Sequence, residues 1–477
     1  MKCEKSEITR HEREASPKCA STVDAIANKC DGGDAAESSS ARSQFPLHHA
    51  AFHNNVQVLS KLIKDGHNVD AQDMHGNTAL HLSVMLGQKE STAILLAHNA
   101  SVKIKNCFGW NSLMEAISYG DRQIIVSLMR KLKSQSRDVI STHKQHLLDV
   151  LNGMKDFYLE LKWDFQSWLP LVSRILPSDV CKIYKRGTTI RFDTTLVDFN
   201  ERTWQRGDIS FIFDAAAEDS NKRLIVLDNQ AKVFQRVLYQ ESEAELDEEV
   251  DVLMSSDIVN VQMSTKPIAF HRCVTGWFFR HDKSELVGEY NADFYHVEGL
   301  RLETRKRREH LSADDIKKNK ALLQNFQMGQ LNEEDFLNRN NNHRASLSPP
   351  PRPVLTFEDY CAAPNGNPPV LGRTPQVKNN TKIFKATVAV STDFPFSIDA
   401  LLDILEVVAP FKHVDKLRKF CELKMPPGFP VRLEIPLFPT ISAKVTFQKL
   451  NFTDDLPKRM FKIPSSYNED PTRFPDL

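Results

Sequence analysis

Apolar residues follow two different periods along this chain of 477 residues. Between about 44 and 161 they recur at every third or fourth position, the spacing of the buried stripe on an amphipathic helix. From about 163 they alternate with polar residues in short runs, as they do in half-buried strands. The pattern predicts an α+β protein, with an all-α N-terminal region followed by a mixed region built mainly on sheet.

The helical region repeats itself at a fixed interval. Leu47, Leu80 and Leu113 are spaced by 33 residues, and each lies in a similar local sequence, such as Thr78–Ser83 (TALHLS). A period of about 33 residues with a T-P-L-H-x-A core is typical of ankyrin repeats, in which pairs of helices stack side by side. We therefore predict three ankyrin repeats over residues 44–135.

Two features within the repeats have a structural interpretation. Gly66 and Asn99 occupy equivalent positions after the second helix of repeats one and two, and both residue types tolerate the left-handed conformation that ends many helices. His48 and His81 occupy the histidine of the motif. We expect each ring to bond backbone groups of a turn, which is a structural and not a catalytic role.

The repeats need covering at their ends, because a short stack leaves apolar surface there. Within residues 136–162 we predict a capping and connecting helix at about 142–161. From 163 to 477 we predict one domain, an antiparallel meander with flanking helices. Its first strands are expected at 181–185, 188–192, 195–199, 209–213, 223–227 and 231–239, with turns at Arg186-Gly187, Arg206-Gly207-Asp208 and Asp228-Asn229-Gln230.

The remaining segments differ in composition. Residues 1–43 are polar and lack an apolar period, which predicts a disordered arm. Residues 337–380 are rich in Asn and Pro and are expected to form a long loop, in which Phe357–Tyr360 docks locally. Further strands are expected at 267–279, 286–302, 383–390, 431–435 and 441–450, and helices at 313–327 (capped by Ser312), 397–408 and 413–423.

Composition narrows the possible functions. Basic and acidic residues balance at 62 each, which argues against bulk binding of nucleic acid. The eight cysteines form no CxxC pair, so a zinc ribbon or thioredoxin-type site is unsupported. We predict neither a metal nor a cofactor. No signal peptide or long apolar stretch is visible, so we expect a soluble protein on the cytosolic or nuclear side. P-loop, GxGxxG, HExxH and nucleophile-elbow motifs are absent, which makes an enzyme the least supported class.

Several long phrases carry a more specific resemblance. They are WDFQSWLP at 163–170, SFIFD at 210–214, CVTGW at 273–277 and KMPPGFP at 424–430. Together with the repeats, these phrases make the chain resemble the ankyrin repeat domain-containing protein 13 family from about residue 44 to the C-terminus. In that family the region after the repeats is a domain that assists G-protein-coupled receptors.

The resemblance implies one of two functions. One branch of the family carries C-terminal ubiquitin-interacting motifs and handles ubiquitinated receptors at endosomes. The other, its C member, lacks those motifs, lies peripherally on the cytosolic face of the endoplasmic reticulum, and binds newly made receptors. The tail at 451–477 is broken by prolines, and 241–256 has the acidic start of a ubiquitin-interacting helix but not its central alanine. The chain therefore resembles the C member, and ubiquitin is not an expected partner.

Exposed aromatic and sulfur-containing side chains on the repeats are the first candidate surface. Ankyrin stacks commonly bind partners through their first helices and turns, where such side chains are good anchors. The alternative is that the second domain packs against the same face. The candidate residues are Phe52, His53, Met74, His75, Met85, Phe108 and Trp110.

A basic run supplies a second candidate surface, which would contact anionic lipid headgroups on the cytosolic leaflet. Alternatives are a nuclear signal, a solvated surface, or pairing with the acidic stretch at 241–251. The residues are Arg301, Arg305, Lys306, Arg307 and Arg308.

These observations lead to one main hypothesis and two alternatives. The main hypothesis is a non-catalytic, chaperone-like protein that retains immature G-protein-coupled receptors and assists their biogenesis and exit. The first alternative is a ubiquitin-linked endocytic adaptor. The second is a lipid-binding protein whose meander curls around an acyl chain.

Overall fold

The chain divides into two compact units in the computed structural model. The repeat unit comprises the chain up to Glu115 together with Pro350–Gly372, and the sheet unit comprises Ala116–Pro349 and Arg373–Leu477. The predicted arm at 1–43, Trp168 and most of the two helices predicted between 397 and 423 lie outside the described residues. The structure describes residues 44–142, 144–167, 176–200, 203–217, 223–237, 243–264, 267–276, 279–328, 344–402, 418, 421–422, 424–438 and 441–474.

Helix pairs form the repeat unit, as the period of 33 residues predicts. Repeat one contains α2 (Pro46–Phe52) and α3 (Val56–Lys64), and repeat two contains α4 (Ala79–Met85) and α5 (Lys89–Ala97). The apolar positions that define the period are core residues, since Leu47, Leu80 and Leu113 are all buried. Repeat three begins with α6 (Ser112–Tyr119), which crosses the boundary between the two units.

The predicted end of each second helix is confirmed. Gly66 has a φ of +90° and Asn99 a φ of +66°, so both residues adopt the left-handed conformation after α3 and α5. Asparagine can replace glycine here because it is among the few residues with a side chain that visit this region routinely. The two repeats therefore use different residues for the same backbone step.

The motif histidines link each repeat to the turn of the next, which confirms their structural role. Nε2 of His48 donates to the carbonyl of Asn77 at 3.0 Å, and Nε2 of His81 donates to the carbonyl of Trp110 at 3.2 Å. Both rings are buried. Burial lowers the pKa of His48, and it lowers the pKa of His81 to about 4. Both rings are therefore neutral at pH 7.

The sheet unit begins with two helices, α7 (Arg122–Thr142) and α8 (Lys144–Gly153). The predicted helix at 142–161 is therefore too long. Its last part, from Phe157, belongs to the first strand, β1 (Phe157–Ser167). Residues Phe157 and Leu161 are four apart, a spacing that puts them on one face of either a helix or a strand.

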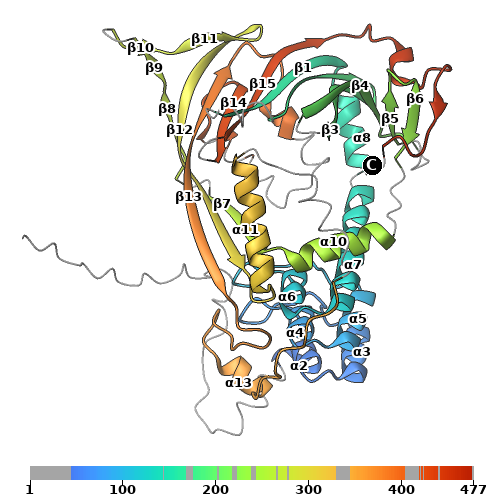
Figure 1. Ribbon diagram of the computed structural model, residues 1–477, viewed down its shortest axis with the longest axis vertical. Coiled ribbons are helices and arrows are strands. Elements are labelled where there is room, and N and C mark those ends of the chain that lie inside the picture. The colour runs from blue at the N-terminus through green and yellow to red at the C-terminus, as the bar shows by residue number, and fades with distance from the viewer. Residues whose placement is uncertain are drawn as a thin grey trace, which may run out of the picture. The chain divides into compact units, whose positions relative to one another are not determined.

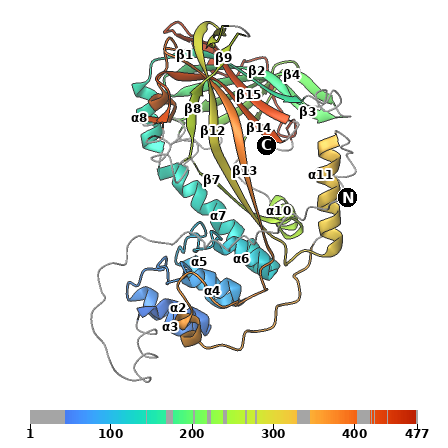
Figure 2. The same ribbon diagram turned by 90° about the vertical axis from the view of Figure 1, so that its left-hand side faces the viewer.

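Fourteen of the described strands form one sheet, in which every pairing is antiparallel except that of β16 with β6. The order is β11-β12-β13-β14-β15-β1-β2-β3-β4-β5-β6-β16, and β7 and β8 also pair with β12. The strands besides β1 are β2 (Ser178–Arg186), β3 (Thr189–Asn200), β4 (Thr203–Asp214), β5 (Leu224–Asp228), β6 (Val233–Arg236), β7 (Ile258–Ser264), β8 (Ala269–Arg272), β11 (Ser284–Val287), β12 (Tyr290–Arg307), β13 (Val377–Ser391), β14 (Phe429–Phe438), β15 (Ile441–Phe452) and β16 (Asn468–Glu469). Figures 1 and 2 show this sheet curving along its length.

The mixed α+β class is confirmed, with several local corrections. The predicted strand at 286–302 spans the hairpin turn between β11 and β12. The predicted strands at 188–192 and 195–199 are one strand, β3, and the predicted turn at Arg206-Gly207-Asp208 lies inside β4. The pairing of β3 with β4 jumps from Thr194↔Ile209 to Leu196↔Arg206. The glycine there belongs to a β-bulge and does not end the strand. The acidic stretch at 241–251 lies mostly in a helix, α10 (Glu243–Ser255).

Other elements complete the sheet unit. The predicted helix at 313–327 is α11 (Ala313–Met328), and its cap is reciprocal, since Ser312 and Asp315 each bond the backbone N–H of the other. A short hairpin, β9 (Val274–Thr275) and β10 (His281–Asp282), and a 3₁₀ helix, η2 (Lys458–Phe461), lie outside the main sheet.

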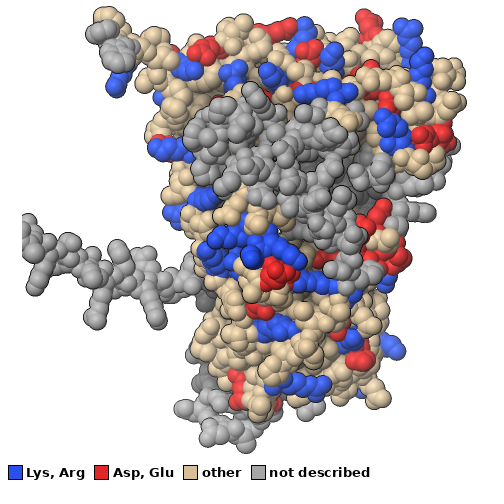
Figure 3. Space-filling model, viewed as in Figure 1, with Lys and Arg blue, Asp and Glu red and all other residues tan. Residues whose placement is uncertain are grey.

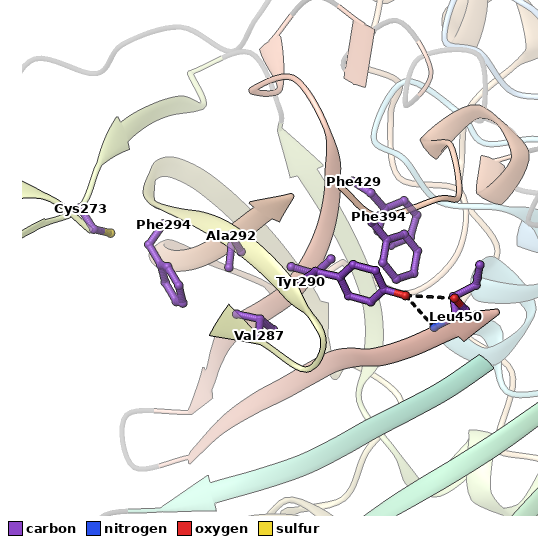
Figure 4. Close-up of a cluster of buried hydrophobic side chains, with 10 residues drawn as sticks. Cys273, Val287, Tyr290, Ala292, Phe294, Phe394, Phe429 and Leu450 are labelled. Atoms are coloured by element: carbon purple, nitrogen blue, oxygen red, sulfur yellow. Dashed lines mark hydrogen bonds between the residues drawn. The ribbon is translucent and has the colours of Figure 1, made fainter. Parts of the chain in front are cut away.

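One hydrophobic cluster of the sheet unit joins distant strands through aromatic rings (Figure 4). Phe394 stacks on Phe429 at 4.3 Å between ring centroids. The hydroxyl of Tyr290 donates to the carbonyl of Leu450 at 3.0 Å and accepts from its N–H at 2.9 Å. The core thus satisfies its one phenol while burying the ring, which is the usual condition for placing tyrosine in an interior.

Candidate partner-binding site on the ankyrin repeats

The candidate face of the ankyrin repeats is covered by a distant part of the same chain. Residues Pro350–Gly372, which we call the strap, belong to the repeat unit although they are more than 200 positions beyond the repeats in the sequence. The strap belongs to the Asn- and Pro-rich loop predicted at 337–380. It contains one short helix, α13 (Phe357–Ala362). Phe357–Tyr360 therefore does dock, but on the distant repeats and not locally as predicted.

The strap helix is defined by local sequence signals. Thr356 caps its start, because its side chain accepts from the N–H of Asp359 at 3.1 Å while the Asp359 carboxylate accepts from the N–H of Thr356 at 2.9 Å. This reciprocal arrangement is a capping box. Ala363 is extended and is followed by Pro364, so the helix stops after six residues.

Apolar contacts hold the strap to the first helices of repeats one and two. Phe357 and Tyr360 are 1% and 0% exposed, and they are three positions apart on one face of the strap helix. The Phe357 ring lies 5.5 Å from the Phe52 ring and 5.3 Å from the His49 ring, centroid to centroid, both edge-on. The cluster consists of Leu82, Phe357, Tyr360 and Leu371, with Phe45, Phe52, Met85, Leu86, Leu355 and Cys361 around it.

Polar contacts fix the tyrosine in one position. The Tyr360 hydroxyl donates to Oδ2 of Asp73 at 2.6 Å and accepts from Nδ2 of Asn77 at 2.9 Å. Nε2 of His75 donates to the carbonyl of Tyr360 at 3.1 Å. Burial and the Asp73 carboxylate raise the pKa of the Tyr360 phenol, so it remains a donor at every physiological pH. The Nδ1 atom of His75 is buried, and no described residue bonds it.

The predicted partner-binding residues fall into three groups. Phe52, His75 and Met85 contact the strap. Trp110, by contrast, is a core residue, only 4% exposed, whose backbone carbonyl accepts from His81. His53 and Phe108 are exposed and Met74 is half-buried. Sequence reasoning missed Asp73 and Asn77 as contact residues, because both read as ordinary turn residues.

Comparison with known proteins places the chain in a family. Residues 191–473 match the family model described as ANKRD13 C-terminal, and residues 20–106 and 47–138 match the model for ankyrin repeats in three copies. Human ankyrin repeat domain-containing protein 13C is 53% identical over 463 residues, which cover 97% of this chain and 83% of that protein. The chain belongs to the ankyrin repeat domain-containing protein 13 family.

Two further relatives place the chain within the family. The zebrafish (Danio rerio) 13C protein is 55% identical over 434 residues, covering 91% of this chain and 88% of the relative. Human ankyrin repeat domain-containing protein 13B is 34% identical over 446 residues, covering 90% of this chain and 71% of the relative. The resemblance to the C member is thus confirmed. None of these three relatives has the name of an enzyme.

The basic run of this family member lies in and just after the long strand β12. Arg307 is only 2% exposed and pairs with Glu309 at 2.7 Å. Burial acts to raise the pKa of Glu309, but Arg307 and the hydrogen bonds of Ser118 outweigh it and lower that pKa. Lys306 and Arg308 both pair with Asp257, at 3.5 and 3.1 Å.

The predicted membrane-surface residues are therefore used unequally. Arg307, Lys306 and Arg308 make internal ion pairs, while Arg301 is exposed. Arg305 is half-buried. On the face of the molecule in Figure 3, basic side chains gather in one area over α11, and elsewhere both signs of charge are interspersed. Exposed lysines of that helix include Lys317 and Lys318.

The acidic helix α10 packs against α7 through charge. Arg122 pairs with Asp247 at 3.0 Å and with Asp251, and Lys133 pairs with Glu249 at 2.7 Å. The partners of the acidic stretch found here are thus on α7, not in the basic run. The apolar stripe of α10, formed by Leu246, Val250 and Met254, is buried. A ubiquitin-interacting helix would need such a stripe to be exposed.

Two negative findings apply to the described residues. No group of three or more His, Cys, Asp or Glu side chains in this part of the chain is arranged to hold a metal ion. No helix in it combines the length and the apolar character needed to cross a bilayer.

Proposed function

We propose that this protein is a non-catalytic, chaperone-like binding protein for newly made G-protein-coupled receptors. It retains immature receptors at the cytosolic face of the endoplasmic reticulum and regulates their exit. The observation that carries the proposal is the similarity to 13C relatives over nearly the whole chain, repeats and sheet unit together. The role implied for that branch of the family then applies to this chain.

The structure is consistent with a mechanism that makes and breaks no covalent bond. Retention of a client then depends on its affinity and on its rate of release, and changes in affinity appear mostly in the release rate. Attachment to the membrane is peripheral in this proposal, which agrees with the helices of the described residues. Exposed basic side chains, such as Arg301 and the α11 lysines, are available for weak contact with anionic headgroups.

The burial of the α10 stripe favours this proposal over the ubiquitin-linked alternative. Leu246, Val250 and Met254 face the interior, and the acidic side chains around them bond α7. Binding ubiquitin through this helix would first require the α7–α10 contact to separate.

Quantitative capture from cells tests the proposal. The tagged full chain is expressed with a G-protein-coupled receptor, and the ratio of core-glycosylated to mature receptor is measured in the captured fraction and in the lysate. We expect that ratio to be at least several-fold higher in the captured fraction. A single-span membrane glycoprotein of the same compartment is the control and should not be enriched.

Two outcomes would contradict the proposal. One is equal recovery of immature receptor and of the control glycoprotein. The other is retention of the protein in membranes after an alkaline wash, as an integral protein would be retained. Ubiquitin pull-down with the same full chain tests the endocytic alternative, and lipid mass spectrometry of the purified chain tests the lipid-binding alternative.

A further inference from the structure

The strap contacts the ankyrin repeats in the way that a bound peptide contacts its receptor. It is a short linear segment, remote in sequence from the repeats, and its helix α13 has only six residues. An isolated helix of that length is not stable in water, so the strap helix depends on the surface it contacts. Its contact side chains, Phe357 and Tyr360, lie on one helical turn, as in the recognition of a helix by a surface.

We propose that this face of the ankyrin repeats is a binding site for a partner peptide of the same chemistry as the strap. The ligand is a capped helical turn with an aromatic residue at its first helical position and a tyrosine three positions later. The strap occupies the site in cis and competes with that ligand. Binding of a partner therefore requires the strap to leave.

The site selects the tyrosine by its hydroxyl group. Asp73 accepts from that hydroxyl and Asn77 donates to it, and all three groups are buried. A ligand with phenylalanine at this position would leave the carboxylate and the amide without their partner. Sites that hydrogen-bond a ligand hydroxyl reject the analogue that lacks it far more strongly than apolar pockets reject a missing methyl group.

The aromatic position is selected by shape. Phe52 and His49 meet the Phe357 ring edge-on, an arrangement that favours aromatic rings beyond the area they bury. Leu371 of the strap is also buried in the cluster. Strap residues that face away from the repeats are not recognised: Val354 is fully exposed, and Asp359 is exposed and bonds only its own cap, Thr356, in the contacts described. On the helical turn itself, the recognition element is therefore the pair of aromatic residues.

The strap is an incomplete ligand for its own site. Nδ1 of His75 is buried and no described residue bonds it, although Nε2 of the same ring bonds the carbonyl of Tyr360. Leaving a buried acceptor unpaired has a substantial free-energy cost. A partner that supplies a hydrogen-bond donor to this nitrogen would bind more tightly than the strap does, which is a condition for displacing it.

Tethering sets the strength of the competition. A segment that belongs to the same chain as its site acts as a ligand at an effective concentration set by the length and stiffness of the connection. The apparent dissociation constant of an external peptide is its intrinsic value divided by the fraction of molecules with a free site. Weakening the strap without changing the repeats should therefore tighten the binding of an external peptide.

Fluorescence anisotropy with a labelled peptide of residues 353–372 tests the proposal in the full-length chain. The release variant carries Phe357→Ala and Tyr360→Ala, and the matched control carries Val354→Ala in the same strap. We expect the peptide to bind the release variant at least ten-fold more tightly than it binds the wild type or the control. A peptide with Tyr360→Phe should bind the release variant at least ten-fold more weakly than the wild-type peptide.

Three outcomes would overturn the proposal. The first is equal, weak binding of the peptide to the release variant and the wild type while hydrogen exchange shows protected repeat helices. The second applies if the release variant does not fold, in which case the full chain with Tyr360→Phe replaces it. That outcome is that the labelled peptide binds the Tyr360→Phe chain no more tightly than it binds the wild type. The third is a concentration-dependent dimer of the wild type, which would assign the site to the strap of a second copy.

The inference does not depend on the receptor proposal. Its ligand is defined by side-chain chemistry, so a failure to capture receptors would leave the peptide result unchanged. Conversely, if the peptide fails to bind, receptors could still be captured through another surface, so the capture experiment would keep its meaning.

Discussion

The turns of repeats two and three have the same geometry and bind different things. In repeat two, Oδ1 of Asp73 accepts from the N–H groups of His75 and Asn77 at 2.8 and 2.9 Å. In repeat three, 33 residues later, Oδ1 of Asn106 accepts from the equivalent N–H groups, those of Phe108 and Trp110, at 3.1 and 3.0 Å. In each turn, therefore, one side-chain oxygen atom accepts two backbone hydrogen bonds that stabilise the turn.

The second atom of each side chain makes the difference. Oδ2 of Asp73 accepts from the Tyr360 hydroxyl of the strap, whereas Nδ2 of Asn106 donates to Oδ1 of Asn77 at 3.0 Å. Asn77 in turn donates to the Tyr360 hydroxyl. A chain of hydrogen bonds thus runs from repeat three through repeat two to the strap. The two turns therefore have the same backbone hydrogen bonds. They differ in the second polar atom of the side chain, Oδ2 of Asp73 or Nδ2 of Asn106, and this atom determines which group each turn binds.

The largest effect on the difference between the two turns is expected from removing Tyr360, the strap residue that the repeat-two turn binds. Tyr360→Ala deletes a fully buried ring and leaves Asp73 and Asn77 without their partner. Large-to-small changes of buried aromatic residues cost about 3–5 kcal/mol. We expect the strap amides, such as that of Tyr360 or Asp359, to lose their hydrogen-exchange protection by about that amount.

The repeats themselves should be nearly unaffected by this change. Their own hydrogen bonds, such as those from His48 and His81 to neighbouring turns, do not involve the strap. Val354→Ala, which alters an exposed strap residue, is the control and should leave the strap protected. Global loss of protection in Tyr360→Ala would show instead that the strap is an indispensable part of the repeat core.

Acidification tests the histidine hydrogen bonds that join each of the two turns to the preceding repeat. Burial lowers the pKa of His81 to about 4, below its ordinary value of 6.5, so the unfolded chain binds a proton more readily than the folded repeats. The contribution to stability is therefore complete above about pH 6.5 and is lost as the pH falls toward 4. At pH 5 the loss from this group amounts to about 2 kcal/mol.

Native-state hydrogen exchange of the repeat amides between pH 7 and pH 5 measures this effect. His48, whose pKa is also lowered by burial, adds to the loss in the same direction. His81→Gln should reduce the dependence of stability on pH, because it removes the group that takes up a proton on unfolding. An equal pH dependence in wild type and His81→Gln would refute the assignment.

The repeats could be predicted from the sequence because their determinants are local. The spacing of Leu47, Leu80 and Leu113 and the left-handed residues Gly66 and Asn99 all act within a few turns of chain. The local signal at Phe357–Tyr360 was also readable as a docking segment. Its receptor was not, since Tyr360 meets Asp73 across 287 positions and no period links them.

The sheet unit shows where local patterns mislead. Phe157 and Leu161 suit a helix, but Leu159 and Trp163 continue an alternation that belongs to a strand, and pairing with β15 and β2 decides between them. Gly207 beside Asp208 is a common turn pair, yet it forms a bulge because β3 pairs on both sides of it. Pairing across the sheet outweighs local propensity in each case.

Charge was the least predictable property. A run of basic residues suggested a surface, but Arg307 is buried because Glu309, two residues along the chain, neutralises it and Ser118 bonds both side chains. Which charges remain in solvent depends on partners that only the fold brings together.

Exchanging the residues Asp73 and Asn106 between the two turns should have a smaller effect on stability than removing Tyr360. Asp73→Asn should preserve the turn, as Asn106 shows, but it replaces the acceptor of the Tyr360 hydroxyl with a donor. We expect about 1 kcal/mol less protection of the strap, the size of one hydrogen bond. The reverse change, Asn106→Asp, removes the donor to Asn77 and should destabilise the repeats more than the strap.

Hydrogen exchange separates the two variants by location. Strap amides should respond to Asp73→Asn while repeat amides remain within error of the wild type. If the repeat amides lose protection in Asp73→Asn, the turn requires the negative charge of the carboxylate and not only an oxygen atom at the position of Oδ1.

The smallest effect concerns the residues that end the second helices. Asn99 adopts in repeat two the conformation that Gly66 adopts in repeat one, and a Cβ added at Gly66 meets nothing within 4 Å. Gly66→Asn should therefore change the stability of the repeats by only a few tenths of a kcal/mol, because asparagine pays little for a positive φ. Gly76→Asn is the matched control, since a Cβ there lies 2.8 Å from the backbone nitrogen of Cys107. Thermal unfolding should show a clear loss for Gly76→Asn and almost none for Gly66→Asn; similar losses would mean that open space at Gly66 does not decide the outcome.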